Sequence, residues 1–223
     1  MGATLSHAAT RAVYDRIGGW LDTQRFYEDA AIAELFTHSA FGSATSVFEL
    51  GTGTGRVAAR LLREHLPAGS RYQGVDSSPT MVGLARARLQ PWHGRATVTL
   101  TEGSPRLDAP QAAFDRFLST YVLDLLSADD IRAVLAEAHR LLAPNGRLCL
   151  VSATHGRSTL ERLVMGAAGG VHRLSPQLVG GCRAIDLRSF LEAERWRVFH
   201  HQVVSKWGIP SEVVVCLRRG DGS

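Results

Sequence analysis

The sequence contains few of the residues that build disulfide frameworks or metal sites. Only three cysteines occur in 223 residues, without a CxxC pair, so neither a disulfide framework nor a zinc ribbon is expected. The nine histidines show no HxxxH or HxH spacing, so we also expect no metal site. We expect Cys149, Cys182 and Cys216 to be small buried apolar residues.

Long apolar runs are missing as well. The longest stretch without Asp, Glu, Lys or Arg covers 14 residues, Leu35 to Phe48, which is shorter than the ~20 apolar residues of a membrane span. The N-terminus has no apolar leader core and reaches a charge at Arg11. We therefore expect a cytoplasmic protein without a transmembrane segment, for which peripheral membrane contact stays open.

Lysine is almost absent, because the 25 basic residues include only Lys206 besides arginines. The net charge is +4, and the arginines are scattered along the chain rather than clustered. Nucleic acid is therefore not the expected partner, and the oligomeric state cannot be read from the sequence. With 45% hydrophobic and 21% charged residues, the chain has the composition of an ordinary globular domain, which excludes collagen, coiled coil and disorder.

The length favours one domain over residues 1–223. From Ser46 onward, short apolar runs alternate with helical ones, which indicates a parallel sheet wrapped by helices. The fold class is therefore α/β, with helices on both faces of the sheet and a terminal antiparallel hairpin at its edge. The parts expected are an N-terminal helical lid (1–44), a cofactor-binding core (45–153), a candidate substrate cover (154–184) and a helix plus hairpin (185–223).

Individual elements follow from apolar spacing and from capping and breaking residues. Expected strands are Ser46 to Leu50, Arg71 to Val75, Thr97 to Thr101, Phe114 to Ser119, Arg147 to Ser152, Arg197 to Val204 and Glu212 to Leu217. Expected helices are Ala8 to Leu21, Gln24 to Phe36, Arg56 to Leu66, Ser78 to Leu89, Ser127 to Leu142 and Asp186 to Glu194, of which the first two are expected as a lid or flank outside the core.

The sharpest motif is ELGTGTGR, in which a buried strand runs through Gly51, Gly53 and Gly55 into a helix. Glycine can adopt backbone angles, and permit a close approach of a ligand, that a Cβ atom would forbid. The turn lies at the carboxyl end of the sheet, where open α/β folds bind ligands. The motif therefore predicts a cofactor site, although a tight turn without a ligand would use the same residues.

Charge indicates which cofactor this site would take. The glycines do not fit the GxGxxG spacing of a dinucleotide site, because Arg56 stands at the sixth position. Glu49 would lie beside the turn, where two like charges ~4 Å apart repel by about 4 kcal/mol at an effective dielectric of ~20. A phosphate would be repelled, whereas the ammonium and sulfonium groups of S-adenosylmethionine would be attracted.

Two further residues fit an adenosine ligand. Asp76 ends the second strand, where its carboxylate could accept hydrogen bonds from both ribose hydroxyls, or could instead cap the following helix. Met81 lies on the first turn of that helix and would cover the adenine or belong to the core.

At this point the chain resembles the class I S-adenosylmethionine-dependent methyltransferases. Five segments match the motifs of that family in order: ELGTGTGR, GVDSSPTMVGLAR, EGSPRL, FDRFLSTYVLDLL and RLLAPNGRLCLVS. The resemblance spans about residues 47–152 and implies a Rossmann-like, seven-stranded sheet. Shorter segments resemble bacterial quinone and lipid methyltransferases: Tyr14-Asp15, YVLDLL, GGCR at 180–183 and GIPSE at 208–212.

The resemblance implies that Glu49 and the glycines meet the methionine end of the cofactor, Asp76 the ribose, and Gly103 with Ser104 the adenine edge. Many relatives carry an acid where Ser104 stands, which weakens that last assignment. Tyr14 would close over the cofactor, or simply pack on the core. The cofactor residues expected are Tyr14, Glu49, Gly51, Thr52, Gly53, Gly55, Asp76, Ser77, Met81, Gly103, Ser104 and Ser119.

Methyl transfer depends mainly on alignment and exclusion of water, so a catalytic base is needed only when the acceptor must lose a proton. Asp124 and His155 follow the fourth and fifth strands and are the candidates, with Tyr14 beside them. Both residues also have a simpler interpretation without a catalytic role. Asp124 would then only hydrogen-bond to nearby backbone groups, and His155 would lie in an exposed loop. His172 is a weaker candidate for the base, and His200 and His201 are outside candidates. Three residues at the end of the fourth strand should lie near the methyl group: Ser119, Thr120 and Tyr121. Alternatively, they only make the hydrogen bonds that are usual at a strand end.

The sequence therefore predicts a methyltransferase for a small, apolar or aromatic acceptor, such as a quinone precursor, a lipid headgroup or a secondary metabolite. Alternatives are a nicotinamide-dependent oxidoreductase and a non-catalytic S-adenosylmethionine-binding protein. An RNA or protein methyltransferase would need a basic surface or a peptide groove that no motif indicates. His200 and His201 are adjacent on a predicted strand, so they should point to opposite faces and not share a metal ion.

Overall fold

The structure is a computed structural model that describes residues 25–155 and 183–220. In this part the chain folds around one seven-stranded sheet with the order β3-β2-β1-β4-β5-β7-β6. β1 to β5 are parallel, and β7 lies antiparallel between β5 and β6. The predicted fold class is confirmed. The strands are β1 (Ser46–Leu50), β2 (Arg71–Asp76), β3 (Ala96–Leu100), β4 (Phe114–Thr120), β5 (Leu142–Ala153), β6 (Trp196–Lys206) and β7 (Ile209–Arg218).

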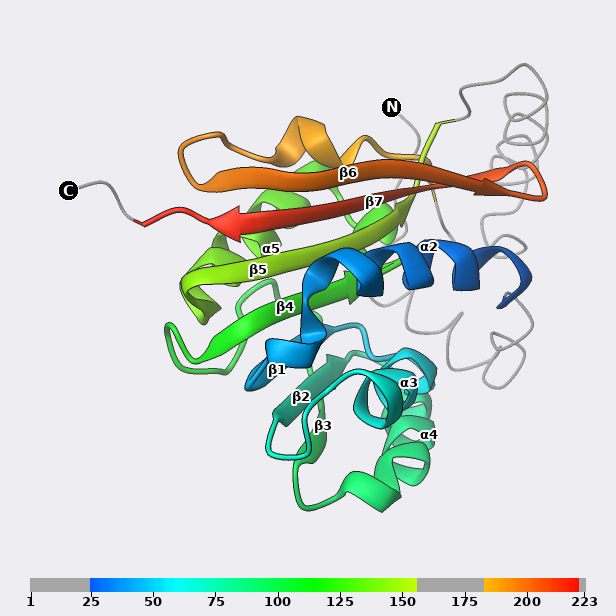
Figure 1. The fold of residues 1–223 in the computed structure, drawn as a ribbon, viewed down its shortest axis with the longest axis vertical. Coiled ribbons are helices and arrows are strands. Elements are labelled where there is room, and N and C mark those ends of the chain that lie inside the picture. Colours follow the sequence, from blue (N-terminus) through cyan, green and yellow to red (C-terminus); the bar gives the residue numbers. More distant parts are fainter. Residues whose placement is uncertain (1–24, 156–182, 221–223) are drawn as a thin grey trace.

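Helices cover both faces of this sheet, as Figure 1 shows, with α2, α3 and α4 on one face and α5 on the other. Ser78 accepts a hydrogen bond from the Met81 backbone and caps α4, and Ser127 caps α5 in the same way through Asp130. Both caps agree with the predicted helix starts. The helices are α2 (Arg25–Ser39), α3 (Arg56–Glu64), α4 (Pro79–Leu89) and α5 (Ala128–Leu141).

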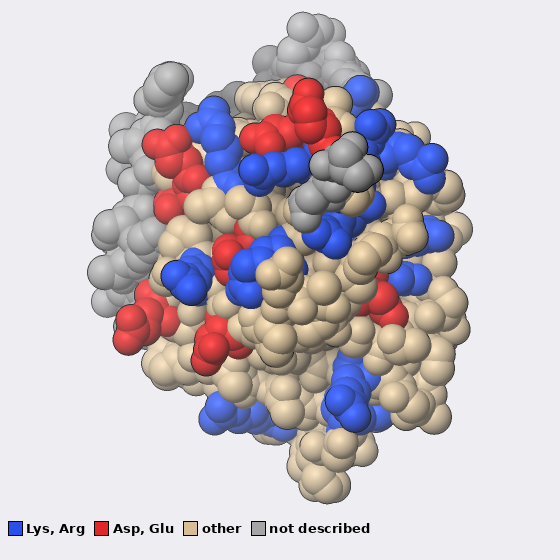
Figure 2. All heavy atoms as spheres, turned by 90° about the vertical axis from the view of Figure 1, so that its left-hand side faces the viewer, with Lys and Arg blue, Asp and Glu red and all other residues tan. Residues whose placement is uncertain are grey.

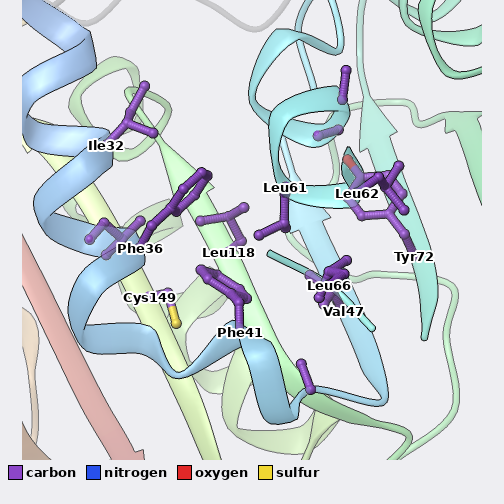
Figure 3. Close-up of a cluster of buried hydrophobic side chains, with 14 of the residues drawn as sticks. Ile32, Phe36, Phe41, Val47, Leu61, Leu62, Leu66, Tyr72, Leu118 and Cys149 are labelled. Atoms are coloured by element: carbon purple, nitrogen blue, oxygen red, sulfur yellow. The ribbon is translucent and has the colours of Figure 1, made fainter. Parts of the chain in front are cut away.

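Helix α2 differs from its prediction as a lid or flank. Its residues Ala31, Ile32 and Leu35 are at most 1% exposed and belong to the core on the α3 side of the sheet. Figure 3 shows Phe36 of this helix next to Phe41 and Leu118, and the two phenyl rings meet edge to face at 5.4 Å. Burying each such side chain contributes about 1.5–3 kcal/mol, so α2 is a layer of the core. The first predicted helix, Ala8 to Leu21, lies outside the described residues, as do the other residues before 25.

The predicted helix from Asp186 to Glu194 is wrong. Only a short 3-10 turn, Leu187–Phe190, forms there, capped by Asp186. The backbone N–H of Leu187 donates to the Glu212 carboxylate on β7 at 2.7 Å. This tertiary bond and the packing of Leu187 into the core fix the segment in a shape that its local spacing does not indicate.

Many arginines bind backbone carbonyls within the fold. Arg95 donates to the carbonyls of Leu62 and Pro67, and Arg116 donates to those of Ser39 and Ala40. Figure 2 shows basic and acidic side chains interspersed over one face of the molecule. These arginines therefore stabilise the fold through hydrogen bonds to backbone carbonyls, in agreement with their scatter along the sequence.

The described cysteines, Cys149 and Cys216, are free and buried, as expected, whereas Cys182 lies outside the described residues. Within the described residues, no helix is long and apolar enough to cross a membrane.

Candidate functional site

The candidate site is built where the parallel strands end. β1, β2, β4 and β5 run in one direction, so Gly51, Asp76, Tyr121 and Thr154, each at or just after a strand end, lie along one edge of the sheet. This edge is on the right of Figure 1. The sequence motifs expected to bind the cofactor thus come together at the carboxyl ends of the strands, as open α/β folds require.

The glycine turn has the backbone that the sequence predicted. Gly51, Gly53 and Gly55 all have positive φ angles, of 77°, 55° and 76°. A Cβ atom on Gly51 would lie 2.2 Å from Cγ2 of Val122, whereas no described residue lies within 4 Å of a Cβ atom on Gly53. Gly51 therefore allows the turn to pack against the loop after β4, and the described residues leave space at Gly53 in which a ligand can approach the backbone.

The N–H groups of the turn are largely used within the protein. Those of Gly51 and Thr52 donate to the Val75 carbonyl at 2.8 and 3.1 Å, and that of Gly55 donates to Thr52 at 3.0 Å. The N–H of Gly53 donates to Oδ2 of Asp76 at 2.8 Å. A diphosphate normally binds such a turn through these donors, so this turn is poorly equipped for a dinucleotide.

Asp76 connects the turn to α4. Its Oδ1 accepts from the Ser78 backbone at 2.9 Å while its Oδ2 accepts from Gly53. Ser78 itself caps α4, so Asp76 supports the start of the helix rather than being its cap. A carboxylate accepts hydrogen bonds from backbone N–H groups and from hydroxyls alike, so Asp76 has the chemistry that a ribose hydroxyl requires.

Glu49 lies directly beneath the turn in a closed polar network. Its side chain is 0% exposed, its Oε2 accepts a short hydrogen bond from the Tyr72 hydroxyl, and its Oε1 has no hydrogen-bond partner among the described residues. Tyr72 also contacts Thr52 at 3.4 Å, and a Cβ on Gly74 would lie 2.2 Å from Oγ1 of Thr52. Glycine at position 74 therefore leaves the space that this network needs.

Burial raises the pKa of Glu49 from 4.5 to about 8, and the nearby charge of Asp76 adds to the increase. The sequence predicts a charged carboxylate at this position, and the structure corrects this: without a nearby cation Glu49 is mostly protonated at neutral pH. A buried acid with an unpartnered oxygen is a group that a bound cation would ionise.

Four further predicted cofactor residues lie on the loop after β3 and at the start of α4. The loop with Gly103, whose φ is 83°, follows β3, and Thr101 in it donates to the Asp76 carbonyl at 2.9 Å. Ser104 is exposed and accepts from the Arg106 backbone at 3.2 Å. Met81 is 1% exposed, as in a core position, and Ser77 is half-buried.

Ser119, at the end of β4, donates a hydrogen bond to the Leu50 carbonyl at 3.2 Å. This is the structural role at a strand end that was the alternative to a position near the methyl group. Two residues later Tyr121 has a φ of 55°, rare for a residue with a side chain. Its hydroxyl bonds Ser211 of β7 at 2.8 Å, which joins the end of β4 to the hairpin.

Asp124 follows β4 and is fully buried. Its Oδ2 accepts from the Ala153 backbone at 3.2 Å, whereas its Oδ1 has no hydrogen-bond partner in the described part of the chain. Burial raises its pKa from 3.8 to about 7, which suits a proton acceptor near neutral pH, although no solvent reaches its side chain. His155 is exposed, after β5. Tyr14 and His172 lie outside the described residues.

Sequence reasoning missed several residues that shape the site. Tyr72, which donates a hydrogen bond to Glu49, is not part of any motif recognised in the sequence. Arg88 of α4 donates to the carbonyl and the hydroxyl of Thr54 and so fixes the turn from outside. Arg56 pairs with Glu28 at 2.6 Å and with Asp29, both on the first turns of α2. Arginine pairs of this kind join segments far apart in sequence, so no local spacing reveals them.

His200 and His201 face opposite sides of the sheet, as predicted. His201 bonds Glu212, whereas His200 lies 2.9 Å from Glu34 and stacks on His38 of α2. Among the described residues, Glu34, His38 and His200 are close enough to be considered for a metal ion, which the sequence did not suggest. The two imidazole planes are nearly parallel, 3.6 Å apart at an angle of 3°, so both cannot direct a nitrogen lone pair at one ion in this arrangement.

Comparison with known proteins adds to this geometry. Residues 47–146 match the protein family described as "Methyltransferase domain". The chain is 33% identical over 111 residues to demethylmenaquinone methyltransferase from Tropheryma whipplei (strain Twist), an alignment that covers 50% of this chain and 43% of that protein. The chain thus spans less than half the length of that curated relative.

Solved structures share the fold across nearly the whole chain. The [4+2]-cyclase SpnF has a TM-score of 0.74 and 13% identity, and the match covers 96% of this chain and 97% of that one. N-methyltransferase NodS from Bradyrhizobium japonicum WM9, in complex with S-adenosyl-L-homocysteine, has a TM-score of 0.71 and 18% identity, covering 95% and 99%. At these identities the likeness is one of fold.

Proposed function

We propose that this chain, whose residues 47–146 match a methyltransferase domain, is a class I S-adenosylmethionine-dependent methyltransferase that transfers a methyl group from S-adenosylmethionine to a small-molecule acceptor. The observation that carries the proposal is the glycine turn itself. The described residues leave space beside it at Gly53, it rests on a buried acid at Glu49, and its N–H groups are used within the protein. Such a turn favours a cationic ligand over a phosphate.

The residues at the strand ends fit this cofactor. Asp76 would accept hydrogen bonds from the ribose hydroxyls, and the loop with Gly103 and Ser104 would border the adenine. Glu49, ionised by the cation, would stabilise the methionine end, where its unpartnered oxygen is an available acceptor. When bound, the cofactor supplies a methyl group on a sulfonium centre, which leaves as a neutral thioether. The chain contributes alignment and exclusion of water, which can amount to ~7–11 kcal/mol of the barrier.

The acceptor class rests on relatives and on the site. Demethylmenaquinone methyltransferase from Tropheryma whipplei, by its name, acts on a quinone-type ring, so we propose an aromatic or enolic acceptor for this chain as well. Such an acceptor must lose a proton, and we propose that Asp124, whose pKa burial raises to about 7, accepts it. Tyr14, His155 and His172 remain proposals from the sequence.

We also propose that the protein acts in the cytoplasm. The free thiols of Cys149 and Cys216 are compatible with a reducing compartment. Fractionation of cells that express a tagged chain tests this, and recovery mainly in an exported fraction would contradict it.

Calorimetric titration with S-adenosylmethionine tests the cofactor. We expect the wild type to bind, Asp76→Ala to lose most of the affinity, and the exposed Glu194→Gln control to bind as the wild type does. Binding of NADH instead of S-adenosylmethionine, or equal affinity in Asp76→Ala, would overturn the site assignment.

Activity is a separate question, because one protein with the same fold, SpnF, is a [4+2]-cyclase by name. Incubation with methyl-labelled cofactor and a cell extract should label a small molecule. Tight binding without any labelled acceptor would instead indicate a non-catalytic cofactor-binding protein.

A further inference from the structure

The loop that follows β4 has an unusual backbone at its first residue. Among the described residues, five besides glycines have a positive φ, and Tyr121, at 55°, is the one that directly follows one of the parallel strands β1 to β5. A residue with a side chain is strained in this left-handed region, so the surrounding structure must hold it there. Residues strained in this way concentrate at functional sites.

Contacts with β5 and β7 hold Tyr121 in this conformation. Its backbone N–H donates to the Val151 carbonyl of β5 at 2.8 Å, and its hydroxyl shares a hydrogen bond of 2.8 Å with the hydroxyl of Ser211 on β7. β5 lies between β4 and β7 in the sheet, so the phenol extends across β5. The ring packs on the core of the α2 side, and Ser211 is only 1% exposed. Loss of this bond would deprive a buried hydroxyl of its partner.

The residue after Tyr121 contacts the glycine turn. A Cβ atom on Gly51 would lie 2.2 Å from Cγ2 of Val122, so the Val122 side chain occupies the space on that side of Gly51. The register agrees with this contact, because Leu50 pairs with Ser119 and the two chains leave β1 and β4 side by side. The direction of the backbone at Tyr121 therefore determines where Val122 meets the turn.

The other side of Val122 is fixed as well. Its carbonyl accepts from the Leu125 N–H at 3.0 Å, and Asp124 accepts from the Ala153 N–H of β5 at 3.2 Å. Val122 thus lies between two fixed points of the loop. If the strain at Tyr121 relaxes, the peptide between these points rotates and the Val122 side chain is displaced.

The hydrogen bond joins two distant segments that carry separate motifs. Tyr121 begins YVLDLL, and Ser211 belongs to GIPSE, 90 residues further along the chain. The sheet order places β4 and β5 between β1 and β7. One phenol therefore connects the hairpin strand β7 to the loop that contacts the cofactor turn.

We propose that Tyr121 is a positioning residue for the cofactor, and that its bond to Ser211 holds Val122 against Gly51 in the shape that S-adenosylmethionine binds. The inference rests on the proposed function and adds a residue pair to it. Without the bond, Tyr121 leaves the left-handed region and Val122 moves away from Gly51. The binding-competent turn is then only partly populated, and the apparent affinity falls by that fraction.

Calorimetric titration of variants with S-adenosylmethionine tests the inference. Tyr121→Phe keeps the ring and removes the hydroxyl, and Ser211→Ala removes the partner. We expect each variant to bind about threefold to tenfold more weakly than the wild type, the range that one hydrogen bond allows. The double variant should bind no more weakly than either single variant, because all three lose the same bond. Ser211→Thr keeps a hydroxyl and suits a strand, so it should retain the affinity.

Ser70→Ala is the matched control. Ser70 is also 1% exposed and its hydroxyl donates to the Ala44 carbonyl at 2.6 Å, but it precedes β2, at the amino ends of the strands. This variant should lower the melting temperature and leave the affinity unchanged, which separates positioning from a general loss of stability. Amide hydrogen exchange of the ligand-free chain is the second readout, in which the Gly51 N–H should exchange faster in Tyr121→Phe than in Ser70→Ala.

Three results would each overturn the inference: wild-type affinity in both Tyr121→Phe and Ser211→Ala, losses that add in the double variant, or an equal loss in Ser70→Ala. If Ser211→Ala does not fold, the comparison of Tyr121→Phe with Ser211→Thr decides. If the wild type binds S-adenosylmethionine and these variants bind it equally well, the inference fails while the proposed function stands. If the wild type does not bind S-adenosylmethionine, both fail.

Discussion

Replacing Glu49 by glutamine removes an ionisable group from beneath the glycine turn and leaves its shape. Burial raises the pKa of this carboxyl from 4.5 to about 8. The folded chain therefore holds a proton that the unfolded chain releases, and the free energy of unfolding falls as the pH rises from about 4.5 to about 8. At about 1.4 kcal/mol for each pKa unit, the loss across this window is about 5 kcal/mol. Below the window the carboxyl is protonated in both states and causes no loss.

Urea unfolding at about pH 5 and about pH 8.5 measures this effect. The wild type and Glu49→Gln share all other titrating groups, so the difference in their unfolding free energies isolates Glu49. We expect the glutamine variant to be close to the wild type at the lower pH and more stable by several kcal/mol at the higher pH. The exposed Glu194→Gln control should show no such change with pH. A difference between Glu49→Gln and the wild type that stays constant with pH would refute the reasoning.

Three further predictions concern the ligand and the reaction. Because a cation favours the charged form of Glu49, S-adenosylmethionine should gain affinity over S-adenosyl-L-homocysteine as the pH rises toward 8 in the wild type but not in Glu49→Gln; calorimetry at several pH values measures the ratio. Gly53→Ala should fold with a modest loss of stability, because its φ of 55° strains a side chain although no described residue lies within 4 Å of the Cβ, and it should lose cofactor affinity. Gly51→Ala adds a clash with Val122 to the same kind of strain and should lower the melting temperature further; thermal unfolding with and without cofactor separates the two. If Asp124 accepts a proton, the rate of methyl transfer should rise with pH through about 7, and Asp124→Asn should flatten this profile in a labelled-methyl assay.

The parallel core could be predicted because its signals are local. An apolar run followed by three glycines marks β1 and its turn, and the observed strand, Ser46–Leu50, has the predicted bounds. Serine before Pro79 and before Ala128 marks the helix starts, and both serines cap as expected. These features depend on neighbours within a few residues, which the sequence displays directly.

The errors arise where distant residues decide the structure. The 3-10 turn at Leu187–Phe190 depends on Glu212, and α2 belongs to the core because its apolar face meets β5 and β7. Helical spacing alone cannot distinguish a lid from a core layer, since both bury one face.

The candidate site shows the same division. The positions of the glycine turn and Asp76 could be read from the motif, but the ionisation of Glu49 could not, because it depends on Tyr72 and complete burial. The pairing of His201 with Glu212 joins two strands of the hairpin in a register that the sequence does not reveal.

A crystal structure of the chain grown with S-adenosylmethionine tests the central claim most directly. The account predicts the ligand at the strand ends, with its ribose hydroxyls on the Asp76 carboxylate and its sulfonium end toward Glu49. A ligand bound elsewhere, or a dinucleotide whose diphosphate lies on the glycine turn in a parallel crystal with NADH, would contradict it.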